Sequence, residues 1–190
     1  MKVKQFVMAY SAEQDRIRAI LPDGFESLRP VLRINAEIID DIRCSIEFNT
    51  AVIKDGKKGW LNVWNSSSAE FRQDHENTIF QSPELMISFR RTGIIGSCPA
   101  EKDNEGTFYL GNLFRKTEII TEKKEFSDSE FCWKTADGTS GKSQGKTIPA
   151  IPTEQRIIYD QKPLTLQNAA EFPCIEVLGS YSVEFERIRI

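Results

Sequence analysis

The region over residues 8–39, MAYSAEQDRIRAILPDGFESLRPVLRINAEII, constrains the fold of this chain more than any other region. It predicts a strand, then a short helix over residues 13–20 that Ser11 caps, then a strand that Pro30 opens. Pro22 ends the helix, because a proline cannot continue it. The chain is therefore expected to begin with a compact strand–helix–strand unit.

Alternating side chains indicate that the strand after Pro30 spans residues 31–39. Its apolar face is formed by Leu32, Ile34, Ala36 and Ile38, and its polar face by Arg33, Asn35 and Glu37. Further segments with strand character are residues 6–10, 44–53, 60–64, 85–89, 108–114, 117–121, 125–134, 156–159 and 177–190. Many short strands, few helices and closely spaced turns predict a mainly β fold, either a closed or nearly closed barrel or a sandwich.

The polar strand positions have two interpretations. The residues concerned are Arg33, Asn35, Glu37, Glu184 and Glu186. In an open sheet they form the face that water covers. In a barrel, some of them line a polar interior that holds a ligand. Alternation assigns residues to two faces, but it does not say which face points inward.

Composition narrows the classes of protein to which the chain can belong. With 190 residues, 39% hydrophobic and 28% charged, we expect one globular domain over residues 1–190. A net charge of −3 gives no basis for binding nucleic acid or an anionic membrane. Apolar runs fall far short of the ~20 residues that a membrane span needs. The N-terminal residues lack a signal-like apolar stretch, so we expect a cytoplasmic protein.

The sequence gives little indication of a metal-binding or nucleotide-binding site. The four cysteines form no CxxC pair, and His75, in a polar stretch that predicts an exposed turn, is the single histidine. Residues 136–143, ADGTSGKS, match a relaxed phosphate-loop pattern, but the following glycine and prolines prevent the helix that such a loop requires. We therefore expect no metal and no cofactor, and a small molecule as the partner.

Three segments resemble the acetoacetate decarboxylase family. They are residues 6–39, residues 44–63 (CSIEFNTAVIKDGKKGWLNV) and residues 164–185 (LTLQNAAEFPCIEVLGSYSVEF). The resemblance implies an antiparallel, double-meander-type β-barrel with a few short helices. It also implies a lyase that decarboxylates a small keto acid or related carbonyl compound, and it is compatible with a homo-oligomer. Glu47 falls where the family places an active-site glutamate.

The resemblance implies a lysine that attacks a ketone to form a Schiff base. An apolar pocket or a neighbouring cation makes a lysine lose its proton more easily, as in acetoacetate decarboxylase itself. Adjacent lysines carry this role in the family, and their counterpart here is Leu113-Phe114-Arg115-Lys116. Direct placement puts Arg115 at the nucleophile's position, where it cannot serve because arginine stays protonated. A shift of one residue makes Lys116 the nucleophile and Arg115 its electrostatic partner.

Two functions of different class follow from these residues. In the first, Lys116 forms the imine and Glu47 positions the substrate or handles its proton, while Arg33 and Asn35 contact the substrate. Asn35 replaces a second glutamate of the family. In the second, the barrel has lost decarboxylation and binds a small molecule in the equivalent cavity, since a fold does not determine a function.

Overall fold

The computed structural model describes residues 1–66, 68–75, 77–83, 85–92, 105–109, 113–116, 125–135, 140–143, 156–159, 162–165 and 175–187. Its elements are β1 (Lys2–Ser11), α1 (Gln14–Ile20), β2 (Glu26–Ile39), β3 (Arg43–Lys54), β4 (Lys57–Ser66), β5 (Glu70–Asp74), β6 (Asn77–Gln81), β7 (Leu85–Arg91), β8 (Gly106–Tyr109), β9 (Leu113–Lys116), β10 (Glu125–Thr135), β11 (Ser140–Ser143), β12 (Arg156–Tyr159), β13 (Lys162–Thr165) and β14 (Glu176–Glu186). The predicted strand over residues 117–121 lies outside the described residues. None of the helices in the described ranges has the length and apolar character needed to cross a membrane.

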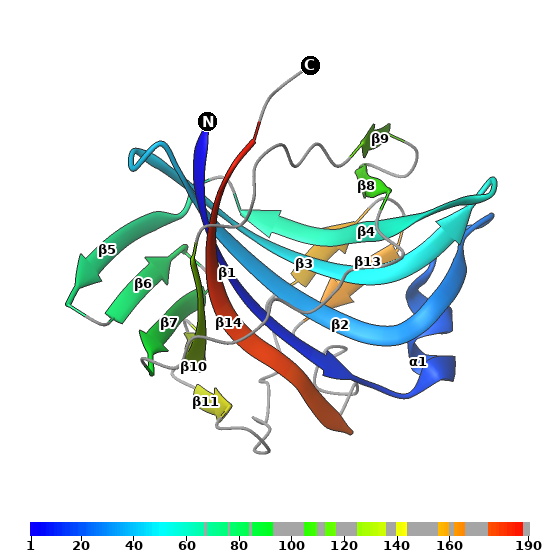
Figure 1. Ribbon diagram of the computed structural model, residues 1–190. Helices are drawn as coiled ribbons and strands as arrows, with labels where there is room; N and C mark the ends of the chain where they lie inside the picture. Colours follow the sequence, from blue (N-terminus) through cyan, green and yellow to red (C-terminus); the bar gives the residue numbers. More distant parts are fainter. Residues whose placement is uncertain are drawn as a thin grey trace.

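The strands form one strongly curved sheet in the order β5-β6-β7-β10-β14-β1-β2-β3-β4-β8-β9, in which β11 also pairs with β10 (Figure 1). Strands β12 and β13 pair separately. The mainly β class is therefore confirmed. The closed antiparallel barrel is not confirmed. The end strands β5 and β9 do not pair with each other in the described ranges, and β4 runs parallel to β8. Near the β5 end, the sheet curls back until β5 contacts β3.

The N-terminal strand–helix–strand unit is present, with two corrections. Ser11 is the last residue of β1 and does not cap α1; the N-cap is Glu13, which makes no side-chain capping hydrogen bond. Pro30 lies inside β2 rather than at its start, where the register with β3 shifts between Arg29 and Leu32. That irregularity tolerates a proline because proline has no N–H to donate to a ladder.

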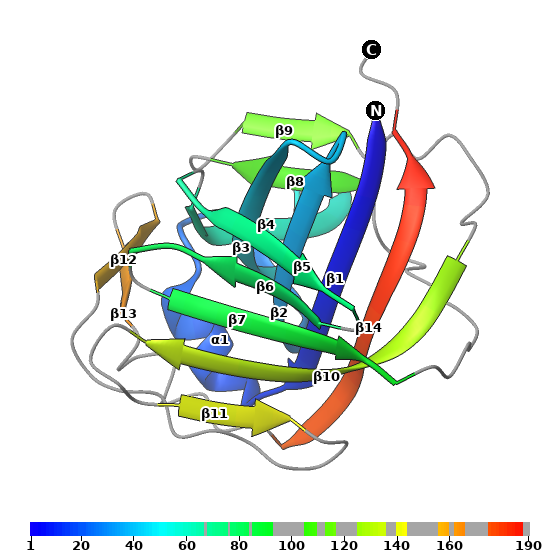
Figure 2. The same ribbon diagram turned by 90° about the vertical axis from the view of Figure 1, so that its left-hand side faces the viewer.

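One face of the β1–β3 sheet carries the main apolar core. Phe6 of β1 packs edge-on against Phe80 of β6, with ring centroids 5.3 Å apart, and contacts Phe89 of β7 at the same separation. Phe80 and Phe89 are almost completely buried. In Figure 2, β6 and β7 lie across β1 and β2, as these contacts require. The core therefore holds two parts of the curved sheet together face to face.

The opposite face of the same strands is polar and also buried. Arg33, Asn35 and Glu37 are only 6%, 7% and 6% exposed. The interpretation of these three residues as a water-covered face is therefore wrong. Glu186 is exposed and Glu184 half-buried, so they do not share this environment. Buried polar groups need hydrogen-bonding partners, which directs attention to this face as a functional site.

Candidate functional site

Six polar side chains from strands far apart in the sequence meet on this face. We call them the polar cluster: Gln5 of β1, Asn35 and Glu37 of β2, Glu47 of β3, Tyr109 of β8, and Arg187 directly after β14. The ladders bring the first four together, because Gln5 pairs with Glu37 and Asn35 pairs with Glu47 across neighbouring strands. Figure 1 shows β1, β2 and β3 side by side along the curved sheet.

Glu37 is the ionised acid of the polar cluster. The Arg187 guanidinium donates two hydrogen bonds to its carboxylate, from Nη1 to Oε2 at 2.8 Å and from Nη2 to Oε1 at 2.7 Å. Gln5 Nε2 donates a third, at 2.9 Å. Burial acts to raise the pKa of Glu37, but the hydrogen bonds and charge of Arg187 outweigh it, so this pKa lies below its ordinary value.

The pKa of Glu47 is shifted in the opposite direction, above its ordinary value. Burial raises its pKa, and the negative charge of Glu37 raises it further, while hydrogen bonds from Tyr109 and Asn49 offset part of the effect. The Tyr109 hydroxyl lies 3.2 Å from Glu47 Oε1. The two acids therefore differ in protonation tendency, a combination typical of sites that hold one carboxylate charged and use the other to exchange a proton.

The raised pKa of Glu47 predicts that Glu47→Gln is more stable than the wild type at pH 8. Above the ordinary pKa of 4.5, the unfolded chain ionises first, so the buried carboxyl group costs stability. This cost is absent below pH 4.5, where Glu47 is protonated in both the folded and the unfolded state. As the pH rises above 4.5, the cost grows until the pH exceeds the folded-state pKa. Urea denaturation from pH 4 to pH 8 measures it. An advantage of the variant that does not grow with pH would contradict the assignment.

The predicted strand over residues 108–114 is in fact a hairpin of β8 and β9. Its register places Arg115 opposite Thr107 and Lys116 opposite Gly106. Because side chains alternate, Arg115 lies on the same face as Tyr109, and its guanidinium sits 5.2 Å from the Tyr109 ring centroid. Lys116 lies on the other face of the hairpin and is exposed.

The structure thus brings together some of the sequence-predicted site residues but not all. Glu47 and Asn35 are direct cross-strand neighbours, and Arg115 reaches them through Tyr109. Arg33 is buried two positions along β2 from Asn35, with its guanidinium 4.8 Å from the Trp60 ring centroid. Lys116 does not point toward this group.

Sequence reasoning missed Tyr109 and Arg187 as members of the site. They lie 62 and 150 residues from the glutamates that they contact, and neither belongs to a local motif. Glu37 was recognised as a strand-face residue only. Its pairing with Gln5 could have been inferred from the alternation of β1 and β2, had their register been known.

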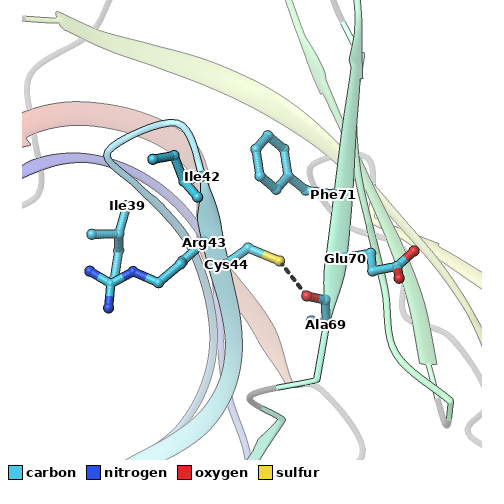
Figure 3. Close-up of a pocket in the computed structure, with 7 residues that line it drawn as sticks. All are labelled: Ile39, Ile42, Arg43, Cys44, Ala69, Glu70 and Phe71. Atoms are coloured by element: carbon cyan, nitrogen blue, oxygen red, sulfur yellow. Dashed lines mark hydrogen bonds between the residues drawn. The ribbon is translucent and has the colours of Figure 1, made fainter.

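A separate pocket of about 590 Å³ lies where β5 approaches the β2–β3 hairpin (Figure 3). The Cys44 thiol points into it and donates a hydrogen bond to the Ala69 carbonyl oxygen at 3.0 Å. Burial and the charge of Glu70 raise the pKa of this thiol, which therefore stays protonated and is a poor nucleophile. Within the described ranges, no three His, Cys, Asp or Glu side chains gather as metal ligands.

Comparison with known proteins finds similarity in structure alone. No family model matches the sequence, and no curated protein matches it. Acetoacetate decarboxylase from Legionella pneumophila is 11% identical, with a TM-score of 0.53 over 98% of this chain and 84% of that chain. An acetoacetate decarboxylase-like enzyme from Sphingomonas wittichii is also 11% identical, with a TM-score of 0.52 over 96% of this chain and 87% of that chain. The chain therefore has an acetoacetate decarboxylase-like fold.

Proposed function

We propose that this protein binds a small carbonyl compound at the polar cluster and that Glu47, rather than an imine at Lys116, acts on the carbonyl oxygen. The acetoacetate decarboxylase-like fold supports a small-molecule site. The observation that carries the proposal is the arrangement of the two acids: Arg187 neutralises Glu37 with two hydrogen bonds, whereas Glu47 is half-buried beside it and has a raised pKa.

The chemistry follows from the groups around Glu47. A protonated carboxyl group can donate to a carbonyl oxygen and so polarise the C=O bond. The Tyr109 hydroxyl donates to Glu47 Oε1, and Asn49 also hydrogen-bonds to this carboxyl group, so the carboxyl proton is what Glu47 offers to the ligand. The Arg115 guanidinium, held against the Tyr109 ring, supplies positive charge for the carboxylate of a keto acid.

The placement of the cations argues against an imine. Lys116 is exposed and lies on the hairpin face opposite Tyr109. In the part of the chain that the structure describes, the hydrogen-bond and ion-pair partners of Glu37 and Glu47 include no lysine. The cations next to the Glu47–Tyr109 pair are Arg187 and Arg115, and an arginine does not become a neutral nucleophile.

Borohydride trapping combined with thermal unfolding tests this proposal. The protein is mixed with acetoacetate or pyruvate, reduced with borohydride, and weighed intact by mass spectrometry; a parallel sample is melted with each compound. We expect a rise in Tm and no covalent adduct, because a ligand at 100 times its Kd stabilises the folded state by about 2.7 kcal/mol. The Tm shift should be lost in Glu47→Met, which keeps the size of the side chain and removes the donor.

Lys116→Met is the matched control, and we expect it to keep the Tm shift. An adduct that forms in the wild type and disappears in Lys116→Met would instead establish the Schiff-base enzyme. A Tm that no carbonyl compound raises would also refute the proposal. Each result therefore distinguishes a binding site built on Glu47 from an imine-forming lysine.

A further inference from the structure

Asn35 has a buried oxygen that the polar cluster does not use. The side chain is 7% exposed, and its Nδ2 lies 3.5 Å from Glu37 Oε1, to which it donates. Its Oδ1 is buried and has no hydrogen-bond partner among the described residues. Exchanging the two atoms would place Oδ1 against the Glu37 carboxylate, so the contact with Glu37 determines this orientation.

A second polar side chain, that of Glu47, lies directly opposite Asn35 on the neighbouring strand. Asn35 and Glu47 are paired residues of β2 and β3, so their Cβ atoms are about 5 Å apart on the same face. Glu47 Oε1 accepts from the Tyr109 hydroxyl, and Asn49 also hydrogen-bonds to the Glu47 carboxyl group. A proton on the Glu47 carboxyl group, whose pKa is raised, is a donor, and Asn35 Oδ1 is an acceptor. Together they place a donor and an acceptor side by side, with Asn35 buried and Glu47 half-buried.

We propose that Asn35 and Glu47 together recognise a hydroxyl group next to a carbonyl group, so that the preferred ligand is an α-hydroxy carbonyl compound. The ligand's hydroxyl donates to Asn35 Oδ1, and its carbonyl oxygen accepts from Glu47. This inference rests on the proposed function and makes the ligand class narrower. A compound with carbonyl groups alone leaves Asn35 Oδ1 without a donor, and a buried acceptor without a donor is costly.

A competing explanation is that Glu47 itself donates its proton to Asn35 Oδ1. In that case, the two side chains satisfy each other, and a ligand hydroxyl brings no advantage. The two explanations differ in what they predict for ligands that vary only in the hydroxyl group. Small ketones of nearly equal size, with and without a hydroxyl group, therefore distinguish the two explanations.

Isothermal titration calorimetry of the full chain with three four-carbon ketones provides the test. The probes are 3-hydroxybutan-2-one, butan-2-one, which lacks the hydroxyl, and butane-2,3-dione, which has a second carbonyl in its place. We expect the hydroxy ketone to bind about tenfold or more tightly than either other compound, as is usual when a buried polar group gains its partner. Equal binding of all three would overturn the inference and favour mutual pairing of Asn35 and Glu47.

Two variants test whether Asn35 is responsible for the preference for the hydroxy ketone. Asn35→Leu keeps the size and removes the acceptor, so the hydroxy ketone should bind no better than butan-2-one; a preference that survives would overturn the inference. Ser27→Ala is the matched control, because Ser27 Oγ is another buried atom without a described partner, near the start of the same strand. It should leave the preference unchanged.

If none of the three compounds binds but a keto acid does, only this inference fails. If keto acids also do not bind, the proposed function fails too.

Discussion

Replacing Arg187 with methionine is expected to lower the free energy of unfolding by about 3 kcal/mol. This is the lower end of the loss found when one partner of a buried ion pair is removed. Glu37 would remain buried without the two hydrogen bonds that now neutralise it. Urea denaturation at pH 7 measures the loss. The double variant Glu37→Gln/Arg187→Met should recover most of it, because a neutral amide does not need the cation.

The pH dependence of this loss has a definite sign. The pKa of Glu37 in the folded protein lies below its ordinary value of 4.5, so the ion pair contributes in full above pH 4.5. Its contribution is lost as the pH falls through the lowered pKa. The gap between the wild type and Arg187→Met should therefore narrow in acid.

Lys4→Met is the matched control for Arg187→Met. Lys4 Nζ lies 2.7 Å from Asp41 Oδ1, but the Asp41 side chain is 53% exposed, and exposed ion pairs contribute little to stability. This variant should unfold nearly as the wild type does. An Arg187→Met variant as stable as Lys4→Met would show that Glu37 is not held as a buried ion.

Gly59→Ala is expected to remove ligand binding and to cost about 2–3 kcal/mol of stability, as overpacking does. A Cβ at Gly59 of β4 would overlap the backbone carbonyl of Gly106 on β8. Because both are backbone groups, β8 must move away from β4. Tyr109 lies on β8, so its hydroxyl would leave Glu47, and the Arg115 guanidinium would leave with it. Tm measured with and without 3-hydroxybutan-2-one records both effects.

Gly179→Ala provides the control for Gly59→Ala. A Cβ at Gly179 of β14 would meet the Tyr181 ring at 3.6 Å, which is ordinary van der Waals contact. We expect this variant to keep the wild-type Tm shift with ligand. If Gly59→Ala also keeps the full shift, the docking of β8 on β4 is not what places Tyr109 at the site.

Local patterns were sufficient for most of the N-terminal half of the fold. Alternation identified the strand at β2, and residues 44–53 were expected to form a further strand, which is β3. Turn residues identified the β3–β4 hairpin at Asp55 and Gly56, where both residues have positive φ. The predicted strand over residues 108–114 was wrong because both strands of a short hairpin have strand composition. Composition does not reveal where such a segment reverses direction.

The candidate site was predicted in part, for a physical reason. Asn35 and Glu47 were identified from the resemblance and from alternation, and the β2–β3 ladder makes them neighbours. Lys116 was predicted as the nucleophile because residues 113–116 are the nearest counterpart of the family's adjacent lysines. Which of Arg115 and Lys116 faces Glu47 depends on how β8 docks on β4, and that parallel pairing joins segments far apart in the chain.

By itself, the sequence determined the β class, the positions of the early strands and the division of β2 into a polar face and an apolar face. These properties depend on neighbours a few residues apart, through backbone geometry and side-chain period. Only the tertiary structure decided that the polar face is buried and that Arg187 neutralises Glu37 from 150 residues away. The proton affinity of Glu47 depends on those long-range contacts, because burial and the charge of Glu37 set it together.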